Sequence, residues 1–204
     1  MLVACEYSGT VRDEFLKLGF DAYSCDILPC ESVYCSDQSR HYQRDVIEIL
    51  NQNWDLMIAH PPCTHLSVSG SRWFTEGKKP MHLRDEAIAF VQKLMDADIK
   101  HIAIENPVSV ISSYIRKSDQ MINPYQFGHK EYKRTCLWLK DLPKLIETHN
   151  VKAETDQLHP KEKNRIWWLG SGKGKERSLF YQGIAKAMAK QWGDYITQNN
   201  GEEK

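Results

Sequence analysis

Short apolar runs alternate with amphipathic segments along this chain. Four runs are short, apolar and bounded by polar or turn-forming residues, which predicts strands at residues 2–5, 21–27, 55–59 and 101–104. Four segments repeat apolar side chains at helical spacing, which predicts helices at residues 10–18, 46–52, 83–98 and 178–197. Strands and helices in alternation predict an α/β fold: a Rossmann-like, mostly parallel sheet with helices on both faces, in a single domain.

The connections between these elements are polar. A polar, cysteine-bearing loop extends to about residue 43, and residues 64–80 are rich in Ser, Gly and Lys. We expect residues 64–80 to be a long mobile segment, and such loops often act as lids over a neighbouring site. Residues 199–204 form a polar tail.

Composition sets outer bounds on the class of protein. A chain of 204 residues with 41% hydrophobic and 26% charged residues is typical of a soluble globular protein with a sizeable core. No apolar run approaches the roughly 18 residues of a membrane span, and the N-terminus has no signal-peptide pattern. We therefore expect a cytoplasmic protein with no membrane partner.

The charge balance bears on the kind of partner. Lys plus Arg and Asp plus Glu number 27 each, so the formal net charge is zero and no global positive field attracts a polyanion. Local basic patches are predicted at residues 129–134 and 161–177. The second patch surrounds Trp167 and Trp168 with basic residues: Lys161, Lys163, Arg165, Lys173, Lys175 and Arg177. Such a segment could bind the phosphates and bases of a nucleic acid, and it is equally typical of a solvated loop. Both interpretations stay open.

Five of the six cysteines suggest no special chemistry. Without secretory features, we expect the six to be reduced thiols rather than a disulfide framework. Cys25, Cys30 and Cys35 are spaced C-x4-C-x4-C, which matches no familiar zinc pattern and has no obvious fourth ligand. We therefore expect ordinary thiols here and no metal site.

Cys63 differs in its setting. The tetrapeptide His60-Pro61-Pro62-Cys63 follows the apolar run at 55–59, so its thiol lies at the carboxyl end of a predicted strand, where open α/β sheets bind ligands. Two consecutive prolines restrict the loop and fix the direction of the thiol. A thiol held in this way can act as a nucleophile, whereas a buried cysteine in a turn would be inert.

Polar clusters also follow the other predicted strands: Glu6-Tyr7-Ser8-Gly9, Asp26 and Glu105-Asn106-Pro107. The glycine of the first cluster lets the backbone approach a ligand beside a helix N-terminus. Asp26 occupies a usual place for an acid that binds ribose hydroxyls. The third cluster follows the strand after the cysteine's own, so we expect the Glu105 carboxylate in the same cleft as Cys63.

In this order, the motifs resemble those of the S-adenosylmethionine-dependent DNA cytosine C5-methyltransferases. Six segments carry the resemblance: the cofactor turn at 6–9, the acid Asp26, the acid Asp45 near the adenine, the Pro-Pro-Cys segment at 55–69, Glu105-Asn106-Pro107 in place of Glu-Asn-Val, and the closing motif at 182–185. It covers most of residues 1–107 and the last helix. It implies the class I methyltransferase fold, with S-adenosylmethionine as cofactor. The implied cofactor-binding residues are Glu6, Tyr7, Ser8, Gly9, Asp26, Asp45 and Pro61.

The resemblance also implies a mechanism. Carbon 5 of cytosine is a poor nucleophile, so a thiolate first adds to C6, and this role falls to Cys63. A carboxyl group at N3 and the exocyclic amine stabilises the adduct, and this role falls to Glu105. Arg134 lies in the region of the family's Gln-x-Arg-x-Arg stretch and is carried over as a third catalytic residue. His60 replaces a usually small residue, and an imidazolium beside the thiol would lower the pKa of Cys63.

The chain lacks room for the family's separate target-recognition domain. Residues 1–198 are expected to form a methyltransferase-like catalytic domain in which residues 107–177 are a reduced recognition region. We therefore expect low sequence specificity on DNA, with a single-stranded or flipped cytosine as target. A phage can encode so compact an enzyme, which would then act in the cytoplasm of the host cell.

Two alternatives remain. The same chemistry could act on a free nucleotide or on RNA, which the neutral charge and the small recognition region favour. The chain could instead be a catalytically silent decoy or inhibitor that binds S-adenosylmethionine or a nucleotide. The presence of both Cys63 and Glu105 argues against a silent protein.

Overall fold

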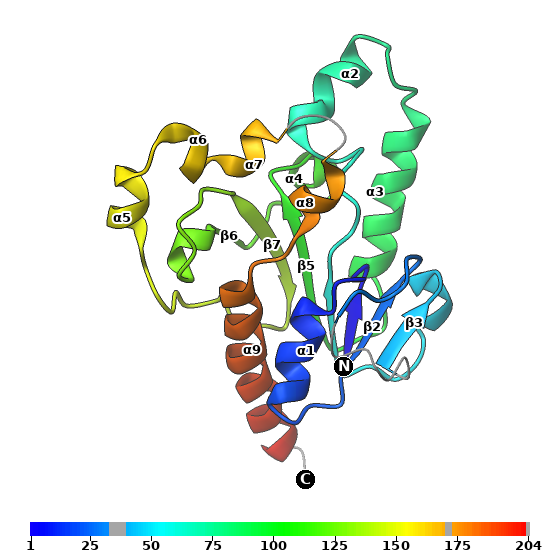
Figure 1. Cartoon of the computed structure of the whole chain (residues 1–204). Helices are drawn as coiled ribbons and strands as arrows, with labels where there is room; N and C mark the ends of the chain where they lie inside the picture. Colours follow the sequence, from blue (N-terminus) through cyan, green and yellow to red (C-terminus); the bar gives the residue numbers. More distant parts are fainter. Residues whose placement is uncertain (33–39, 170–172, 203–204) are drawn as a thin grey trace.

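The computed structural model describes residues 1–32, 40–169 and 173–202, and its centre is one mixed sheet (Figure 1). Seven strands in this described part pair in the order β3-β2-β1-β4-β5-β7-β6. Their bounds are β1 Leu2–Ala4, β2 Tyr23–Asp26, β3 His41–Gln43, β4 Leu56–Ala59, β5 His101–Pro107, β6 Gln120–Ile122 and β7 Thr135–Lys140. The strands β3, β2, β1, β4 and β5 are parallel to one another, and β7 is antiparallel to both of its neighbours. The predicted α/β class with a mostly parallel sheet is confirmed.

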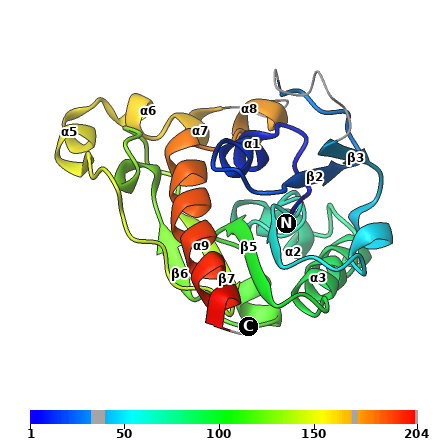
Figure 2. The same cartoon turned by 90° about the horizontal axis from the view of Figure 1, so that it is seen from below.

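Helices lie on both faces of the sheet (Figure 2). Helices α1 (Thr10–Lys17) and α9 (Gln182–Glu202) cover one face, and α3 (His82–Met95) covers the other. The shorter helices are α2 Ser71–Thr75, α4 Ile111–Tyr114, α5 Lys152–Gln157, α6 Pro160–Lys163, α7 Arg165–Trp168 and α8 Gly174–Ser178. Three turns of 3-10 helix are η2 Val46–Ile49, η3 Val68–Gly70 and η4 Pro124–Gln126.

Alternation along the strands divides the core into two layers. Ile58 and Ala103 point toward α1 and α9, where Trp192 is fully buried. Met57 and Ile102 point to the opposite face and pack with α3. Because both faces are covered, the central strands are apolar throughout, and each fully buried large side chain contributes about 1.5–3 kcal/mol.

The strand order fixes where a ligand would bind. From β1 the chain moves outward to β2 and β3, then returns to β4 on the other side of β1 and continues to β5. In open α/β sheets the ligand crevice lies outside the carboxyl ends of the strands at this reversal of direction. The turn after β1 and the Pro-Pro-Cys loop after β4 therefore flank the crevice.

The segment at 64–80 is not the mobile loop that its composition predicts. It contains η3 and α2, and Phe74 of α2 is buried. The Arg84 guanidinium lies 4.0 Å from the centre of the Phe74 ring and also donates to the His65 carbonyl. The composition of this segment is a poor guide because one aromatic side chain, that of Phe74, anchors an otherwise polar stretch to α3.

Several predicted boundaries are also wrong. Strand β5 continues to Pro107, so Glu105, Asn106 and Pro107 lie within the strand rather than after it. The extension exists because β7, which no local pattern predicted, pairs with these residues. Ser178 ends α8, so the last helix begins at Gln182 and extends into the segment expected to be a polar tail. Residues 203–204 of that tail lie outside the described residues.

Candidate active site

The first contact of the site joins the carboxyl ends of β4 and β5. Ile58 of β4 pairs with Ala103 of β5, and two residues further along each strand come His60 and Glu105. Because side chains alternate with a period of two, both point to the face covered by α1 and α9. The His60 Nδ1 lies 3.2 Å from Glu105 Oε2, and both side chains are largely buried.

This contact sets the charge of Glu105. Burial by itself would raise the pKa of Glu105, but the hydrogen bond with His60, the charge of Lys133 and the Thr135 side chain outweigh it, and the pKa lies below its usual value. Glu105 is therefore a carboxylate at neutral pH. Since a carboxylate only accepts hydrogen bonds, the proton between the two side chains belongs to His60 Nδ1.

Asn106 holds the proline loop in place. Its side chain points to the opposite face from Glu105, where Nδ2 donates to the Pro61 carbonyl at 2.8 Å. Both residues are buried, so this hydrogen bond is shielded from water. The backbone N–H of His60 also donates to the Ala4 carbonyl of β1 at 3.0 Å. The loop that carries Cys63 is thus tied to the strands on either side.

Cys63 is an exposed residue whose thiol lies within electrostatic range of the Glu105 carboxylate. Partial burial of the thiol and the negative charge of Glu105 raise the pKa of Cys63, and the positive charges of Lys133 and Arg177 offset only part of this effect. The expectation that His60 would lower this pKa is wrong. His60 acts on Glu105 instead, because the strand register places it opposite that residue.

Lys133 is the basic residue that the sequence analysis missed. Its charge acts on both Glu105 and Cys63, whereas Arg134, which motif matching singled out, is exposed and acts on the Cys136 side chain. Lys133 and Arg134 both precede β7, and of the two only Lys133 is among the groups whose charge acts on Glu105. A catalytic role for Arg134 stays a prediction.

Glu6 anchors the first turn of α1. The chain leaves β1 through Cys5, whose positive φ of 58° turns the backbone sharply. The Glu6 carboxylate then accepts hydrogen bonds from the backbone N–H groups of Val11 at 2.7 Å and Arg12 at 3.2 Å. These N–H groups have no partner within the helix. Burial raises the pKa of Glu6 despite the opposing effects of His60 and of these N–H groups.

The rest of the turn is packed equally closely. The Ser8 hydroxyl accepts from the backbone N–H of Thr10 at 3.3 Å, and the Tyr7 hydroxyl lies 3.0 Å from the Ser178 hydroxyl at the end of α8. Gly9 has a φ of 71°, and a Cβ there would lie 2.6 Å from Arg12 Nη2. Glycine is required here both by its backbone conformation and by the buried arginine beside it.

Two acids mark the far side of the crevice. Asp26 at the end of β2 accepts from the backbone N–H of Leu28 at 2.9 Å, and Asp45 after β3 accepts from that of Ile47 at 3.0 Å. Each carboxylate keeps a second oxygen without a hydrogen-bond partner in the described part of the chain. Ile27, next to Asp26, is 72% exposed. These groups fit the hydroxyls of a ribose and the flat face of an adenine.

In Figure 1, α8 and the segment that leads into α9 lie in front of the sheet. The ring of Phe180 lies 4.6 Å from that of His60, centre to centre, and Gln182 donates to Glu14 of α1. The closing motif at 182–185 thus packs against the helix that follows the predicted cofactor turn. Gly183 is needed for this packing, because a Cβ there would lie 1.9 Å from the Phe127 carbonyl oxygen.

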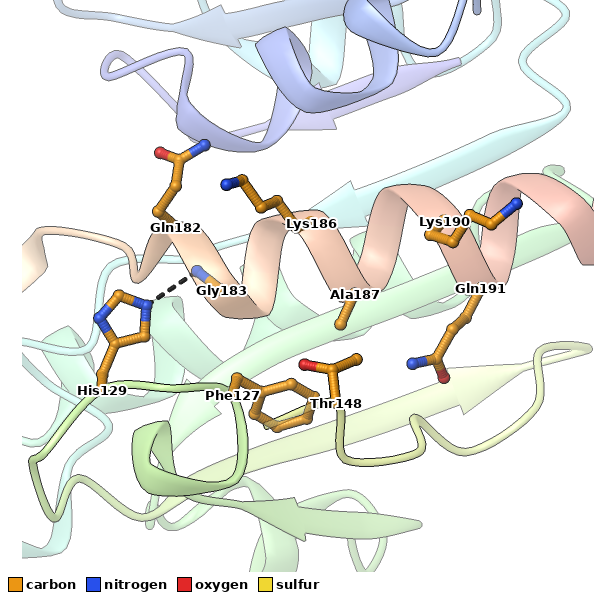
Figure 3. A pocket seen from close by; sticks show the side chains of 9 residues that line it. All are labelled: Phe127, His129, Thr148, Gln182, Gly183, Lys186, Ala187, Lys190 and Gln191. Carbon is orange, nitrogen blue, oxygen red and sulfur yellow. Dashed lines mark hydrogen bonds between the residues drawn. The ribbon is translucent and has the colours of Figure 1, made fainter. Parts of the chain in front are cut away.

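A cavity of about 480 Å³ lies beside α9 rather than at the crevice (Figure 3). On the helix side it is lined by Gln182, Gly183, Lys186, Ala187, Lys190 and Gln191. Across from them His129 Nε2 accepts from the Gly183 N–H at 2.8 Å (Figure 3). None of the predicted catalytic or cofactor-binding residues lines this cavity.

The remaining cysteines divide into thiols and one disulfide. Cys5, Cys25 and Cys136 are free, and the Cys25 thiol donates to the Arg44 carbonyl at 3.3 Å. Cys30 is disulfide-bonded, so the expectation that all six are reduced is wrong. Cysteine spacing alone did not reveal this pairing. Cys35 lies outside the described residues.

Two findings concern partners other than a small ligand. Among the residues that the structure describes, no three His, Cys, Asp or Glu side chains are grouped to hold a metal ion, and no helix is long and apolar enough to cross a membrane. Trp138 is buried in the core, whereas Trp167 and Trp168 are 76% and 56% exposed. Residues 170–172 of the basic segment that follows them lie outside the described part.

No protein-family model and no curated protein matches the chain. Among solved structures, it is similar to one described as a candidate DNA modification methyltransferase encoded within a prophage (E. coli), with 15% sequence identity and a TM-score of 0.46. The match covers 78% of this chain and 55% of that one. The chain therefore spans little more than half the length of this neighbour, and we base its function on the residues of the crevice.

Proposed function

We propose that this chain transfers a methyl group from S-adenosylmethionine to C5 of cytosine in DNA, through a covalent bond between Cys63 and C6. The observation that carries the proposal is the pairing of a thiol with a carboxylate at the carboxyl ends of adjacent strands, beside the crevice. Cys63 lies close enough to Glu105 for the carboxylate charge to raise the thiol's pKa. A nucleophile and an acid–base group on one ring-sized site are what this chemistry needs.

The cofactor site lies on the other half of the crevice. The turn at residues 6–9 and the α1 N-terminus provide its floor, and Asp26 and Asp45 hold the ribose hydroxyls and the adenine amine. When bound, S-adenosylmethionine supplies an electrophilic methyl group. Glu6 keeps the turn in position by holding the first N–H groups of α1.

The proposal also explains why Cys63 is a weak acid in the free protein. The Glu105 charge disfavours the thiolate until a base is bound. When N3 of the base takes up a proton beside Glu105, the positive charge offsets that negative charge and the thiolate is favoured at the moment it is required. The nucleophile is thus activated by its own substrate.

DNA is favoured over a small substrate by the aromatic and basic side chains around the crevice. At the sheet's carboxyl end, Arg72 and Lys78 lie over the Trp73 ring at 4.6 and 4.9 Å, and α2 projects there in Figure 1. On the opposite side, Lys161 lies 5.4 Å from the centre of the exposed Trp168 ring. Such pairs bind phosphates and stack on unpaired bases without reading sequence.

Methylation of a free nucleotide or of RNA is the second candidate. The formal net charge of zero and the short segment between β5 and α9 favour it. Incubation with labelled cofactor and either duplex DNA, single-stranded DNA, RNA or dCMP distinguishes the substrates. Label in DNA supports the first proposal, and label in dCMP alone at low salt overturns DNA as the substrate.

A covalent trap tests the chemistry itself. An oligodeoxynucleotide containing 5-fluoro-2′-deoxycytidine cannot lose its C5 substituent, so the protein should remain attached to it through Cys63. We expect an added mass equal to that of the methylated oligonucleotide in the wild type and in Cys136→Ala, the matched control, and none in Cys63→Ser. An adduct in Cys63→Ser, or no adduct in the wild type, would falsify the covalent route.

A further inference from the structure

We propose that His60 carries the proton that Glu105 lends to the cytosine ring, so that the two side chains work as one proton donor. This inference rests on the proposed C5 methylation. His60 acts through Glu105, whose carboxylate it contacts, and is therefore a positioning residue.

The geometry places His60 between two acids. Its Nδ1 faces Glu105 Oε2 at 3.2 Å, and Glu6 at the end of β1 is near enough for the two opposite charges to interact. The Nε2 atom is buried and has no hydrogen-bond partner in the described part of the chain. The Phe180 ring packs against the imidazole at 4.6 Å. Two acidic side chains thus flank the imidazole, and an aromatic ring packs against it.

Glu105 needs such a partner. At N3 of cytosine the adduct requires a hydrogen-bond donor, because negative charge accumulates there when the thiolate adds to C6. Glu105 is a carboxylate in the free protein and has only acceptors to offer. His60 is hydrogen-bonded to Glu105 and can supply this proton, so no proton has to come from solvent.

The proton movement is balanced over the cycle. As the Cys63 sulfur bonds to C6, the C5–C6 electron pair shifts toward C4 and the C4–N3 pair toward N3. His60 Nδ1 gives its proton to the Glu105 carboxylate, which passes a proton on to N3. After C5 has gained the methyl group, a base removes the C5 proton and the sulfur leaves C6. The N3 proton then returns through Glu105 to His60. The net reaction releases one proton to solvent and leaves His60 unchanged.

The charges around His60 come from four elements. Glu105 lies on β5, Glu6 follows β1, and Cys63 is on the same loop as His60. Lys133, before β7, acts on Glu105 and on Cys63, and Arg177 of α8 acts on Cys63. The active form thus combines a Cys63 thiolate with a His60 imidazolium.

This pairing predicts an unusual pH profile. Between the imidazole and thiol titrations, each unit rise in pH increases the thiolate tenfold and decreases the imidazolium tenfold. The rate of adduct formation on 5-fluoro-2′-deoxycytidine DNA, measured in single turnover with saturating cofactor, should therefore be flat over this interval. Without the histidine the rate should rise tenfold per pH unit over the same range.

His60→Asn is the decisive variant. Asparagine can still donate a hydrogen bond to Glu105 but cannot transfer a proton. We expect its adduct rate at pH 7 to fall about 100-fold, in keeping with the loss of acid catalysis, and to gain the tenfold slope. Cofactor affinity, measured by calorimetry, should stay within about threefold of the wild type. His60→Gln is the second variant should His60→Asn not fold.

The outcomes are distinguishable. A uniform decrease at every pH, with the slope unchanged, would show that His60 only supports the structure and would overturn the inference. A tenfold slope in the wild type itself would overturn it without any variant. A wild type that forms no adduct at any pH would overturn the proposed function and this inference together.

Discussion

Asn106→Ala tests whether one buried hydrogen bond positions the nucleophile. The Asn106 side chain is 2.8 Å from the Pro61 carbonyl, two residues before Cys63, and the residue is 1% exposed. Removing this donor leaves the Pro61 oxygen buried without it, which costs about 1–3 kcal/mol. Asn106 Oδ1 has no partner in the described residues, and its removal offsets part of this cost. We expect a net loss of about 1–2 kcal/mol.

The consequences are measurable in two ways. In a domain of this size the thermal midpoint should fall by about 2–8 °C. The thiol would no longer be held at one place, and a displacement of about 1 Å can slow a reaction about 100-fold. We therefore expect adduct formation with 5-fluoro-2′-deoxycytidine DNA to slow by about 10- to 100-fold. Unfolding in urea and single-turnover mass spectrometry give the two quantities.

A matched control shows whether an effect arises from the position of Asn106 beside the proline loop or from replacing an asparagine by alanine in general. Asn53 is an exposed asparagine in the turn before β4, so Asn53→Ala should change the free energy of unfolding by no more than about 0.5 kcal/mol. Its adduct rate should equal that of the wild type. If Asn106→Ala behaved like Asn53→Ala in both assays, the view that Asn106 positions Cys63 would have to be abandoned.

Two charge changes beside the thiol should act in opposite directions. Glu105→Gln removes the anion that raises the pKa of Cys63, so the midpoint for alkylation by iodoacetamide should fall while methylation is lost. A midpoint that rose would contradict the arrangement. Lys133→Met removes a cation that lowers the same pKa, so its alkylation midpoint should rise. An unchanged midpoint would show that Lys133 does not act on the thiol.

The parts of the site built from adjacent residues could be predicted from the sequence. Strand β4 and its proline loop form one continuous stretch, so the position of Cys63 at the carboxyl end of a strand could be predicted from the sequence. The same holds for β1, the turn at 6–9 and α1. Fold class followed as well, because the alternation of short apolar runs and amphipathic helices is a local property.

The parts that depend on distant pairing could not be predicted. Strand β7 is buried on both faces over Thr135–Trp138, so it shows no alternation, and its partner β5 is some 30 residues away in sequence. Without β7, the sequence does not reveal that Lys133 rather than Arg134 acts on Glu105. The contact of His60 with Glu105 likewise depends on the register of β4 and β5. A sequence motif identifies residues that are close along the chain. Which of these residues contact one another in the fold depends on how the strands pair.

Under the proposed mechanism, the charges around Cys63 explain how an exposed nucleophile stays inert until its substrate binds. A cysteine on an open loop is at risk of oxidation and alkylation in proportion to its thiolate fraction. Here the Glu105 carboxylate lowers that fraction, and His60 and Lys133 in turn keep Glu105 ionised. The thiolate fraction rises only when a ligand takes up a proton next to Glu105, because this offsets the negative charge of the carboxylate. A pyrimidine ring with a basic N3 does so, whereas an electrophile from solvent does not, so the same contacts that suppress the thiol select the substrate that activates it.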